Sequence, residues 1–445
     1  MRKNHQEQLP LVPAGIDHEH AKELEVISDV LDANLMIGAL AAQDLASGID
    51  PMSGRNGMTG DQVVRAALLR QMNGWSYEEL AFHLADSVSC LRFCRIGIAD
   101  VAPKKSTLAD NIKRLLPQTW ESIHQVVVDE AKRRGVERGN QVRMDCTVVE
   151  SPIHEPSDSS LLFDVVRVLA RLLGQAKRLC GIEFSDRCRR AKRRMLGVRN
   201  AKNKAQRKRP YRDLIRVTKE TLHFVDVALP RLDALDPLPA VRGLVDELKH
   251  FAALGWQVVE QTHLRVFEQQ SVSASDKIVS IFEAHTDIIV KDRRETLYGH
   301  KVCLSTGASS MVLDLKVLDG NPADATLVEL MIDRHTMRYG KAPRQAAFDG
   351  GFASKANVEA AKASGVHDVC FSKRRGIEIT DMVKSAWVFK KLKRFRAGVE
   401  GCISWLKRCF GMDRCRWRGL TSFHSYAWAS VVTCNLLILA RHALR

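Results

Sequence analysis

The segment "NQVRMDCTVVESP", residues 140–152, follows a long stretch of helical pattern and precedes another. Its apolar residues alternate with polar ones, which is the period of a half-buried strand: Val142, Met144, Cys146 and Val148. Pro152 ends this pattern. We therefore expect residues 140–152 to form the first strand of an α/β core.

Further strand patterns follow a long helical interruption. They are "KIVSIF" (277–282), "DIIVK" (287–291), "GHKVCLSTG" (299–307) and "MVLDLKVL" (311–318), and they suggest a run of antiparallel strands. The stretch "NPADATLVELMIDRHTMRYG" (321–340) has the pattern of a helix, and "RQAAFD" (344–349) that of a short strand before two glycines. This order of elements predicts a single α/β core that carries an insertion.

The N-terminal third has the pattern of several helices. Helical periodicity runs from about Ala21 to Leu45, and "DQVVRAALLRQMN" predicts a helix that ends at Gly74. Ser76 and Glu79 have the spacing of a capping box for the next helix. A third helix begins in "KKSTLADNIKRLL", where Ser106 or Thr107 can cap it. Two interpretations remain open, a helix-turn-helix DNA-binding unit and a helical bundle that mediates dimerisation.

The charge of the chain indicates a polyanionic partner. The formal net charge is +16 and the pI about 9.4. Residues 186–212 hold thirteen Lys or Arg and one acid, so this segment is either a solvated face or a surface that contacts phosphate groups. We favour phosphate contact, with four candidates: Arg193, Arg194, Lys208 and Arg209.

Membrane and metal alternatives are weaker. Residues 1–10 lack the apolar core of a signal peptide, and the longest apolar run, residues 428–440, is too short to span a bilayer and predicts a buried C-terminal helix. An anionic membrane surface would also attract a basic chain, but nucleic acid is the favoured partner. The eleven cysteines form no CxxC pair, so Cys90 and Cys94 are better explained as buried apolar residues than as zinc ligands.

Three acidic residues stand where a chain can direct side chains to one point. Asp145 lies in the first strand, Asp349 ends a later strand, and Glu400 lies in the most basic stretch of the C-terminal third, "KLKRFRAGVEGCISWLKRCFGMDRCRWRG" (391–419). Apolar residues flank both aspartates, and a carboxylate in such surroundings is costly unless it is paired or binds a cation. Gly350 and Gly351 would allow a bulky ligand to approach Asp349.

The spacing in the C-terminal helix places Glu400 beside two bases. At about 100° per residue, Arg396 and Glu400 differ by about 40° around the helix, and Arg396 and Lys407 by about 20°. These three residues therefore share one narrow stripe. Gly398 and Gly401 flank Glu400 although a glycine inside a helix costs about 1 kcal/mol, and we interpret them as making room for a phosphate backbone.

The order of these acids, together with "RAGVEGCISWLKRCFGMDRCRWRG", "FDGGFAS" and "MDCTVVES", resembles the DDE transposases of bacterial insertion sequences, in the broad fourth-type, fifth-type and not-yet-classified groups. The segment from Thr59 through "KSTL" resembles their N-terminal helical domain, so the matches span about residues 56–420. Two features differ from the family pattern. Lys393 replaces a tyrosine three residues before Arg396, and a large insertion follows the first strand.

The resemblance implies an RNase H-like fold in which Asp145, Asp349 and Glu400 are the catalytic residues and the metal ligands. They would hold two Mg²⁺ ions, which Mn²⁺ can replace, with Asp145 bridging both. The bases around the helix would bind DNA near the scissile bond: Arg396, Lys407, Arg414, Arg416 and Arg418. Trp417 is a candidate for stacking on an unpaired base, whereas Trp405 is better explained as a core residue.

Several other polar residues have simpler explanations than catalysis. Glu150 and Asp164 are expected to be surface or capping acids, and Asp292 and Glu295 to pair with bases in an exposed hairpin. His154 and His300 could move protons, but a two-metal reaction does not need them.

The predicted fold is an α/β, RNase H-like mixed sheet flanked by helices, interrupted by an all-α basic insertion and preceded by an all-α N-terminal domain. The expected units are a helical DNA-binding or dimerisation domain (1–135), the first part of the core (136–158), the insertion (159–275), the remainder of the core (276–420) and a C-terminal helix (421–445).

We predict a transposase of an insertion sequence that cleaves the ends of its element and joins them to target DNA. It would act in the bacterial cytoplasm, at the nucleoid, as a homo-oligomer that holds the terminal inverted repeats and the target, without a membrane. The alternatives are a structure-selective nuclease or resolvase of the same fold and a catalytically idle DNA-binding regulator.

Overall fold

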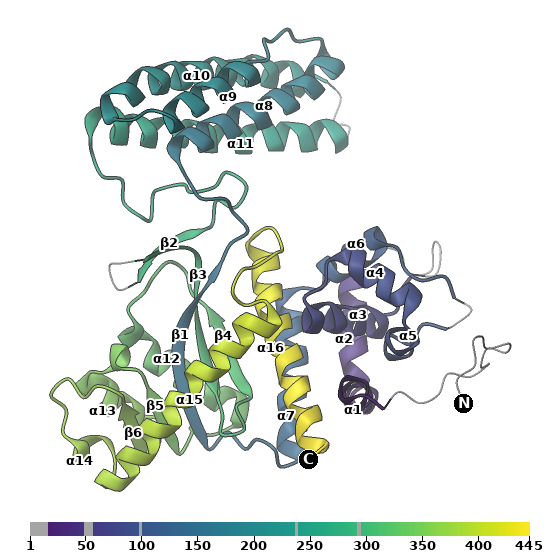
Figure 1. Ribbon diagram of the computed structural model, residues 1–445, viewed down its shortest axis with the longest axis vertical. Helices are drawn as coiled ribbons and strands as arrows, with labels where there is room; N and C mark the ends of the chain where they lie inside the picture. Colours follow the sequence, from purple (N-terminus) through teal and green to yellow (C-terminus); the bar gives the residue numbers. More distant parts are fainter. Residues whose placement is uncertain (1–16, 49–56, 98–99, 236–238, 292–294) are drawn as a thin grey trace, which may run out of the picture.

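The computed structural model describes residues 17–48, 57–97, 100–235, 239–291 and 295–445. Two groups of helices and one mixed sheet make up this part of the chain (Figure 1). The helices of the first group are α1 (Glu19–Ala33), α2 (Met36–Ala46), α3 (Gly60–Asn73), α4 (Tyr77–Asp86), α5 (Val88–Phe93), α6 (Lys105–Arg114) and α7 (Pro117–Arg133).

The sheet contains the strands predicted from the sequence, with one exception. Its strands are β1 (Gln141–Glu150), β2 (Asp287–Lys291), β3 (Glu295–Thr306), β4 (Val312–Val317), β5 (Gln345–Phe348) and β6 (Asp368–Phe371). Their order is β2-β3-β1-β5-β6, and β4 pairs with β3. β3 is antiparallel to β1, β2 and β4, whereas β5 is parallel to β1 and β6 to β5. The mixed α/β fold class is therefore confirmed.

The exception is the segment of residues 277–282, which is not a strand. Ile278 and Ile281 instead pack into the core of the helical insertion. The side-chain amide of Gln261 donates to the carbonyl of Ile278 and accepts from its N–H, so a side chain provides the hydrogen bonds that a neighbouring strand would have supplied. The alternation of apolar residues here reflects packing between helices and not a sheet.

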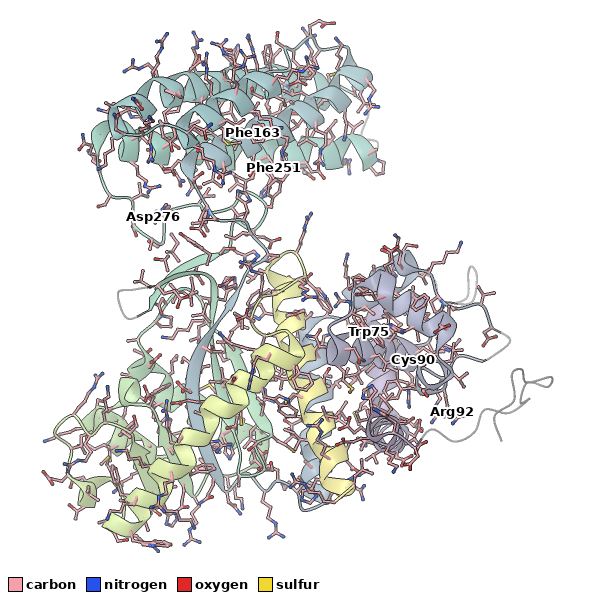
Figure 2. All side chains as sticks on the ribbon, viewed as in Figure 1. Trp75, Cys90, Arg92, Phe163, Phe251 and Asp276 are labelled. Atoms are coloured by element: carbon pink, nitrogen blue, oxygen red, sulfur yellow. The ribbon has the colours of Figure 1, made fainter. Side chains whose placement is uncertain are left out.

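Between β1 and β2 the described residues form four helices, α8 (Asp158–Cys180), α9 (Cys188–Arg199), α10 (Lys204–Asp233) and α11 (Pro239–His263), the last continued by η1 (Leu264–Glu268). They form a bundle at one end of the molecule, beyond the β2–β3 end of the sheet (Figure 1). The bundle has a hydrophobic core of its own, which Phe163 and Phe251 border (Figure 2). A second hydrophobic core is continuous from the N-terminal helices through the sheet to the C-terminal helices.

Shorter elements complete the sheet half: η2 (Asp324–Leu327), α12 (Val328–Tyr339), η3 (Gly350–Phe352), α13 (Lys355–Ala363) and α14 (Ile379–Met382). The long helix α15 (Ala386–Phe410) crosses the strands, and α16 (Leu420–Ala443) lies between the sheet and the N-terminal helices (Figure 1). By length and composition α16 could cross a membrane, with a mean hydropathy of 1.3, but 89% of its most apolar window is buried. The prediction of a buried C-terminal helix is thus confirmed.

Helix boundaries agree with most of the capping signals. The capping box of Ser76 and Glu79 is present, and α3 ends at Gly74, whose φ of 66° suits glycine. The helix predicted in residues 104–116 is present as α6, but its predicted cap is wrong. Its N-cap is Lys104, which makes no side-chain cap, and Ser106 and Thr107 lie inside the first turn.

Two buried histidines predict how stability depends on pH. Burial lowers the pKa of His124 to about 4, with a further effect of Arg338, and burial lowers that of His335 to about 4. Between the ordinary value of 6.5 and these values, the unfolded chain binds protons that the folded chain does not. Lowering the pH from about 7 to about 5 should therefore reduce the free energy of unfolding by about 2 kcal/mol per histidine.

Urea denaturation at the two pH values measures this loss. The variant His124→Gln should lose about 2 kcal/mol of this dependence, whereas His250→Gln, at an exposed histidine on α11, should keep all of it. A dependence unchanged in His124→Gln would contradict the assignment.

Candidate active site

Two of the predicted acids lie at neighbouring points of the sheet. β1 and β5 are parallel, and their register pairs Met144 with Phe348. The residues that follow are Asp145, still within β1, and Asp349, the first residue after β5. The predicted strand positions of both aspartates are therefore correct, and the parallel pairing explains why residues 204 positions apart in the chain end up adjacent.

Helix α15 brings the third acid to the same point, and Arg396 links all three. Nη2 of Arg396 lies 2.8 Å from Asp145 Oδ2 and 3.1 Å from Asp349 Oδ1, and Nη1 donates to Glu400 Oε1 at 2.7 Å. The Arg396 side chain is 12% exposed, whereas that of Glu400 is 67% exposed. Three carboxylates from three separate elements thus surround one guanidinium.

The surroundings shift the pKa values of the two aspartates in opposite directions. Burial raises the pKa of Asp145, although Arg396 and the N–H of Cys146 act against it. Burial alone would also raise the pKa of Asp349, but hydrogen bonds from Ser372 and from the N–H groups of Gly350 and Gly351, together with Arg396, lower it below its ordinary value. Of the two aspartates, Asp349 is therefore held more firmly in its ionised form.

The position of α15 on the sheet depends on Arg143, which lies two residues before Asp145. This buried side chain donates to the Thr306 hydroxyl, the Phe395 carbonyl and the Ser310 hydroxyl, each at 2.9 Å. A Cβ atom at Gly398 would lie 2.0 Å from Arg143 Nη1, but one at Gly401 would meet nothing within 4 Å. Our interpretation of Gly398 needs correction, because the group that approaches it is Arg143 and not a phosphate backbone.

A fourth acid, Asp324, lies beside the site, and the sequence analysis missed it. Its negative charge raises the pKa of Asp145, and a Cβ atom at Gly351 would lie 2.6 Å from Asp324 Oδ2. Lys301 Nζ is 2.6 Å from Asp324 Oδ1. The small residue at position 351 thus accommodates Asp324, whereas a Cβ atom at Gly350 would meet Lys373 at 2.7 Å. Nothing in the linear sequence around Asp324 indicates this proximity.

The bases predicted to bind DNA near the site fall into two groups. Arg414 donates to Glu150 Oε2 at 2.7 Å, and Arg416 donates to the Gly74 carbonyl at 3.1 Å, while both side chains remain exposed. Arg418 is also exposed, and Lys407 is half-buried on α15. Arg396 differs from these because it is paired with the three acids.

The prediction for Trp417 is wrong. Its side chain is 4% exposed and packs against Tyr426, so its faces cannot receive a base in this conformation. Trp405 packs partly buried against the main core, edge-on to Phe410, as predicted.

In the basic insertion, the four predicted residues lie on the α9–α10 hairpin. Arg194 pairs with Asp213 on α10, which also pairs with Arg190 and Arg216. Arg193, Lys208 and Arg209 are exposed. Asp213 directly follows the basic segment and neutralises part of its charge. The count of charges within residues 186–212 did not include this acid.

The residues given simpler explanations lie apart from the three acids, but Asp164 is neither a surface acid nor a cap, because it is buried inside α8. Glu150 pairs with Arg414, and Asp164 pairs with Arg167. His154 lies 3.7 Å from Asp164, and the buried His300 hydrogen-bonds to Asp287 and His285, away from the three acids. Glu295 is exposed at the start of β3, and Asp292 lies outside the described residues.

The donor atoms at the site suit a divalent cation. Three carboxylates are the hard oxygen ligands that Mg²⁺ prefers. Within the described ranges, no three acidic, histidine or cysteine side chains are arranged to hold a metal as they stand. The reason is geometric, since the guanidinium of Arg396 lies between the acids. The acids therefore converge on one positive charge, which in this conformation is a side chain.

Two family models match parts of this chain. The Transposase domain (DUF772) matches residues 14–114, which include helices α1 to α6, and the Transposase DDE domain matches residues 258–436, which include Asp349 and Glu400. Asp145 lies outside both matches. Searches of curated proteins and of solved structures found no match. The two matches together cover more than half of the chain, which is therefore a DDE transposase of the insertion-sequence type.

Proposed function

We propose that this transposase cuts the ends of its element and joins them to target DNA by metal-dependent phosphoryl transfer at Asp145, Asp349 and Glu400. The observation that carries the proposal is the convergence of these three carboxylates on Arg396. A surface ion pair needs one acid, and three acids around one base leave an excess of negative charge. Such an excess favours the binding of a further cation.

The sheet supports the RNase H-like fold. Without the short β2, the strand order is β4-β3-β1-β5-β6, in which β5 and β6 run parallel to β1 and β3 runs antiparallel to it. This arrangement places the end of β5 beside the middle of β1 and leaves one face of the sheet to α15 (Figure 1). The insertion enters after β1, so the bundle does not interrupt the pairing of β1 with β5.

The residues would divide the work as follows. When bound, two Mg²⁺ ions would activate the attacking water or 3′-hydroxyl and stabilise the leaving oxygen, and Mn²⁺ would substitute for them. Asp145 would contact both ions, while Asp349 and Glu400 would each complete one site. Arg396, displaced from the acids, would then be free to hold a phosphate oxygen beside them.

The remaining bases would hold the DNA. Arg414, Arg416, Arg418 and Lys407 continue the line of Arg396 and Glu400 along and beyond α15, and the exposed bases of the α9–α10 hairpin, Arg193, Lys208 and Arg209, would contact a more distant stretch. Arg194 would also contact DNA, but only while it remains paired with Asp213. Two element ends must be held together for joining, so we propose a homo-oligomer acting on bacterial DNA in the cytoplasm.

A strand-transfer assay tests this function. A DNA duplex with an exposed 3′-hydroxyl at the element end should become joined to a target plasmid by the wild-type protein with Mg²⁺. Cleavage without joining would instead favour a nuclease or resolvase, and absence of both would favour a DNA-binding regulator. No feature of the described residues favours either alternative.

Asp324 supplies a separate prediction as a positioning residue. Asparagine at this position keeps the shape beside Gly351 but removes the negative charge near Asp145, so Asp324→Asn should raise the Mg²⁺ concentration for half-maximal nicking several-fold, roughly 3- to 10-fold. The maximal rate at saturating Mg²⁺ should change less. Nicking rates across a Mg²⁺ titration measure both.

The control for this variant is Glu329→Gln, an exposed acid on α12 just beyond the η2 turn. It should leave the Mg²⁺ dependence unchanged. If Asp324→Asn lowers the maximal rate without changing the Mg²⁺ dependence, its role is structural and the prediction is wrong.

A further inference from the structure

A groove where the N-terminal helices meet the end of α15 contains a buried arginine without an anionic partner. The groove has a volume of about 730 Å³ and lies between the C-terminal end of α3 and the last turn of α15 with the loop that follows. Five bases line it, with Asp413 as the one acid among the lining residues: Arg70, Lys407, Arg408, Arg414 and Arg416. In Figure 2, Trp75, which also lines it, lies on the side of the N-terminal helices that faces α15 and α16.

Arg70 is the unusual member of this set. Its residue is 7% exposed, its buried Nε atom has no hydrogen-bond partner, and within the described part of the chain no ion pair joins its guanidinium to a carboxylate. Its contacts are with aromatic rings, at 4.3 Å from the ring centre of Tyr77 and 6.0 Å from that of Trp417. Burial lowers the pKa of Arg70, and the nearby charge of Arg416 acts in the same direction.

A second buried arginine on the same helix has the partners that a structural arginine normally has. Arg65, five residues earlier on α3, is fully buried, and its guanidinium donates to the carboxylates of Asp61 and Asp32. It also donates to the Ser28 hydroxyl and the Phe93 carbonyl. A buried cation normally has such partners because removing it from water is costly. The lack of an anionic partner for Arg70 indicates that the folded chain holds this charge for an anion from outside.

We propose that this groove binds a phosphate of the DNA backbone, with Arg70 as its buried anchor and Arg416 and Lys407 beside it. The inference rests on the proposed function for the identity of the DNA. Lys407 lies seven residues after Glu400, or about 10 Å along the helix. At a rise of about 3.4 Å per base pair, the phosphate in the groove would be on the order of three nucleotides from the scissile one.

The groove gives the N-terminal helices a direct part in the reaction. Arg70 and Gly74 come from the region matched by the Transposase domain (DUF772), and Lys407 and Arg416 from that matched by the Transposase DDE domain. Arg416 already bridges the two regions through the Gly74 carbonyl. A strand bound here would therefore be held by both regions at once, which fixes its register relative to the three acids.

The experiment measures binding of a short DNA duplex by fluorescence anisotropy across a salt series, with Ca²⁺ in place of Mg²⁺ to prevent cleavage. Arg70→Met should weaken binding about tenfold and reduce the slope of log affinity against log salt by about one. Arg416→Gln, at an exposed position, should reduce the slope similarly and does not depend on a core substitution. Arg92→Gln, an exposed base on α5 away from the groove in Figure 2, should leave the slope unchanged.

Thermal unfolding of the free protein separates this role from a structural one. Removing an unpaired buried charge should leave the Tm of Arg70→Met unchanged or raise it, whereas Arg65→Met should lower the Tm by several degrees. Inorganic phosphate should not raise the Tm at concentrations where the duplex does. An equal rise with inorganic phosphate would overturn the assignment to DNA.

The proposal is overturned if Arg70→Met and Arg416→Gln both bind DNA with the slope and affinity of the wild type, or if Arg92→Gln reduces them equally. That result would leave the proposed function intact, because wild-type strand transfer is measured separately. Failure of the wild type to nick or join DNA, with the effect of Arg70→Met on binding still present, would contradict the proposed function and leave the groove as a DNA-binding site.

Discussion

The variant Asp349→Asn should lose Mg²⁺-dependent nicking and joining by at least about 100-fold while it remains folded and binds DNA. Asparagine has nearly the same shape, and it can still accept the hydrogen bond from Ser372. It lacks the negative charge of the Asp349 carboxylate, which the surrounding hydrogen bonds and Arg396 stabilise. Arg396 keeps its contacts with Asp145 and Glu400, so the positions of β1 and α15 should not change.

Nicking of a supercoiled plasmid by purified protein measures this loss. Glu359→Gln, an exposed acid on the nearby helix α13, is the matched control and should nick at the wild-type rate. DNA-binding affinity in Ca²⁺ should be the same for all three proteins. Wild-type nicking by Asp349→Asn would show that the three acids are not the catalytic site.

The second large effect is expected at Gly398. A methyl group there would lie 2.0 Å from Nη1 of Arg143, a buried guanidinium held by hydrogen bonds to Thr306, Ser310 and the Phe395 carbonyl. It cannot move without breaking these bonds, so α15 must shift away from β1. Gly398→Ala should lower the free energy of unfolding by about 1–3 kcal/mol. A displacement of about 1 Å between Glu400 and Asp145 would also reduce nicking by about 100-fold.

Gly401 provides the matched comparison on the same helix. A methyl group at this exposed position meets nothing within 4 Å, and alanine is the better helix former by about 1 kcal/mol. Gly401→Ala should therefore be as stable as the wild type or more so. Urea denaturation of the two variants gives the comparison, and equal destabilisation by both would refute the packing of Arg143 against Gly398.

Gly401→Ala also tests whether a DNA backbone closely approaches the face of α15 that carries Gly401. If a phosphate backbone lies against Gly401, the variant should bind DNA more weakly without losing stability. Unchanged binding would mean that Gly401 tolerates a side chain and that the glycine has no role in DNA contact.

The sequence predicted the elements whose patterns are local. β1 and β5 were recognisable because their apolar residues and flanking breakers belong to the strands themselves, and the shared stripe of Arg396, Glu400 and Lys407 on α15 because it follows from their spacing. The convergence of Asp145, Asp349 and Glu400 came from the resemblance to DDE transposases, since spacing along the chain does not determine which strands become neighbours.

Features that depend on tertiary contacts were not predictable in this way. Arg396 looked like a phosphate ligand because it lies on the face of α15 that carries Glu400, but its partners come from β1 and the end of β5. Asp324 gave no signal, because its closeness to Asp145 arises only when the η2 turn packs beside Gly351.

One missed feature did have a local signal. In the segment after α15, Cys415 and Trp417 are buried while Arg414, Arg416 and Arg418 are exposed. This alternation has the period of an extended chain, and Glu150 pairs with Arg414 as an isolated bridge beside β1. The many positive charges suggested that Trp417 stacks on DNA. The alternation of exposed and buried residues instead indicates that Trp417 is buried.

The most direct test of the central claim is to locate the bound metal. Fe²⁺ in place of Mg²⁺, with ascorbate and peroxide, generates hydroxyl radicals that cleave the polypeptide beside the metal, and mass spectrometry identifies the cut positions. The structure predicts cuts in three segments, around Asp145, Asp349 and Glu400, all lost when Mg²⁺ competes and reduced in Asp349→Asn. Cuts confined to other segments, or an unchanged pattern in Asp349→Asn, would contradict the claim that these acids together bind the catalytic metal.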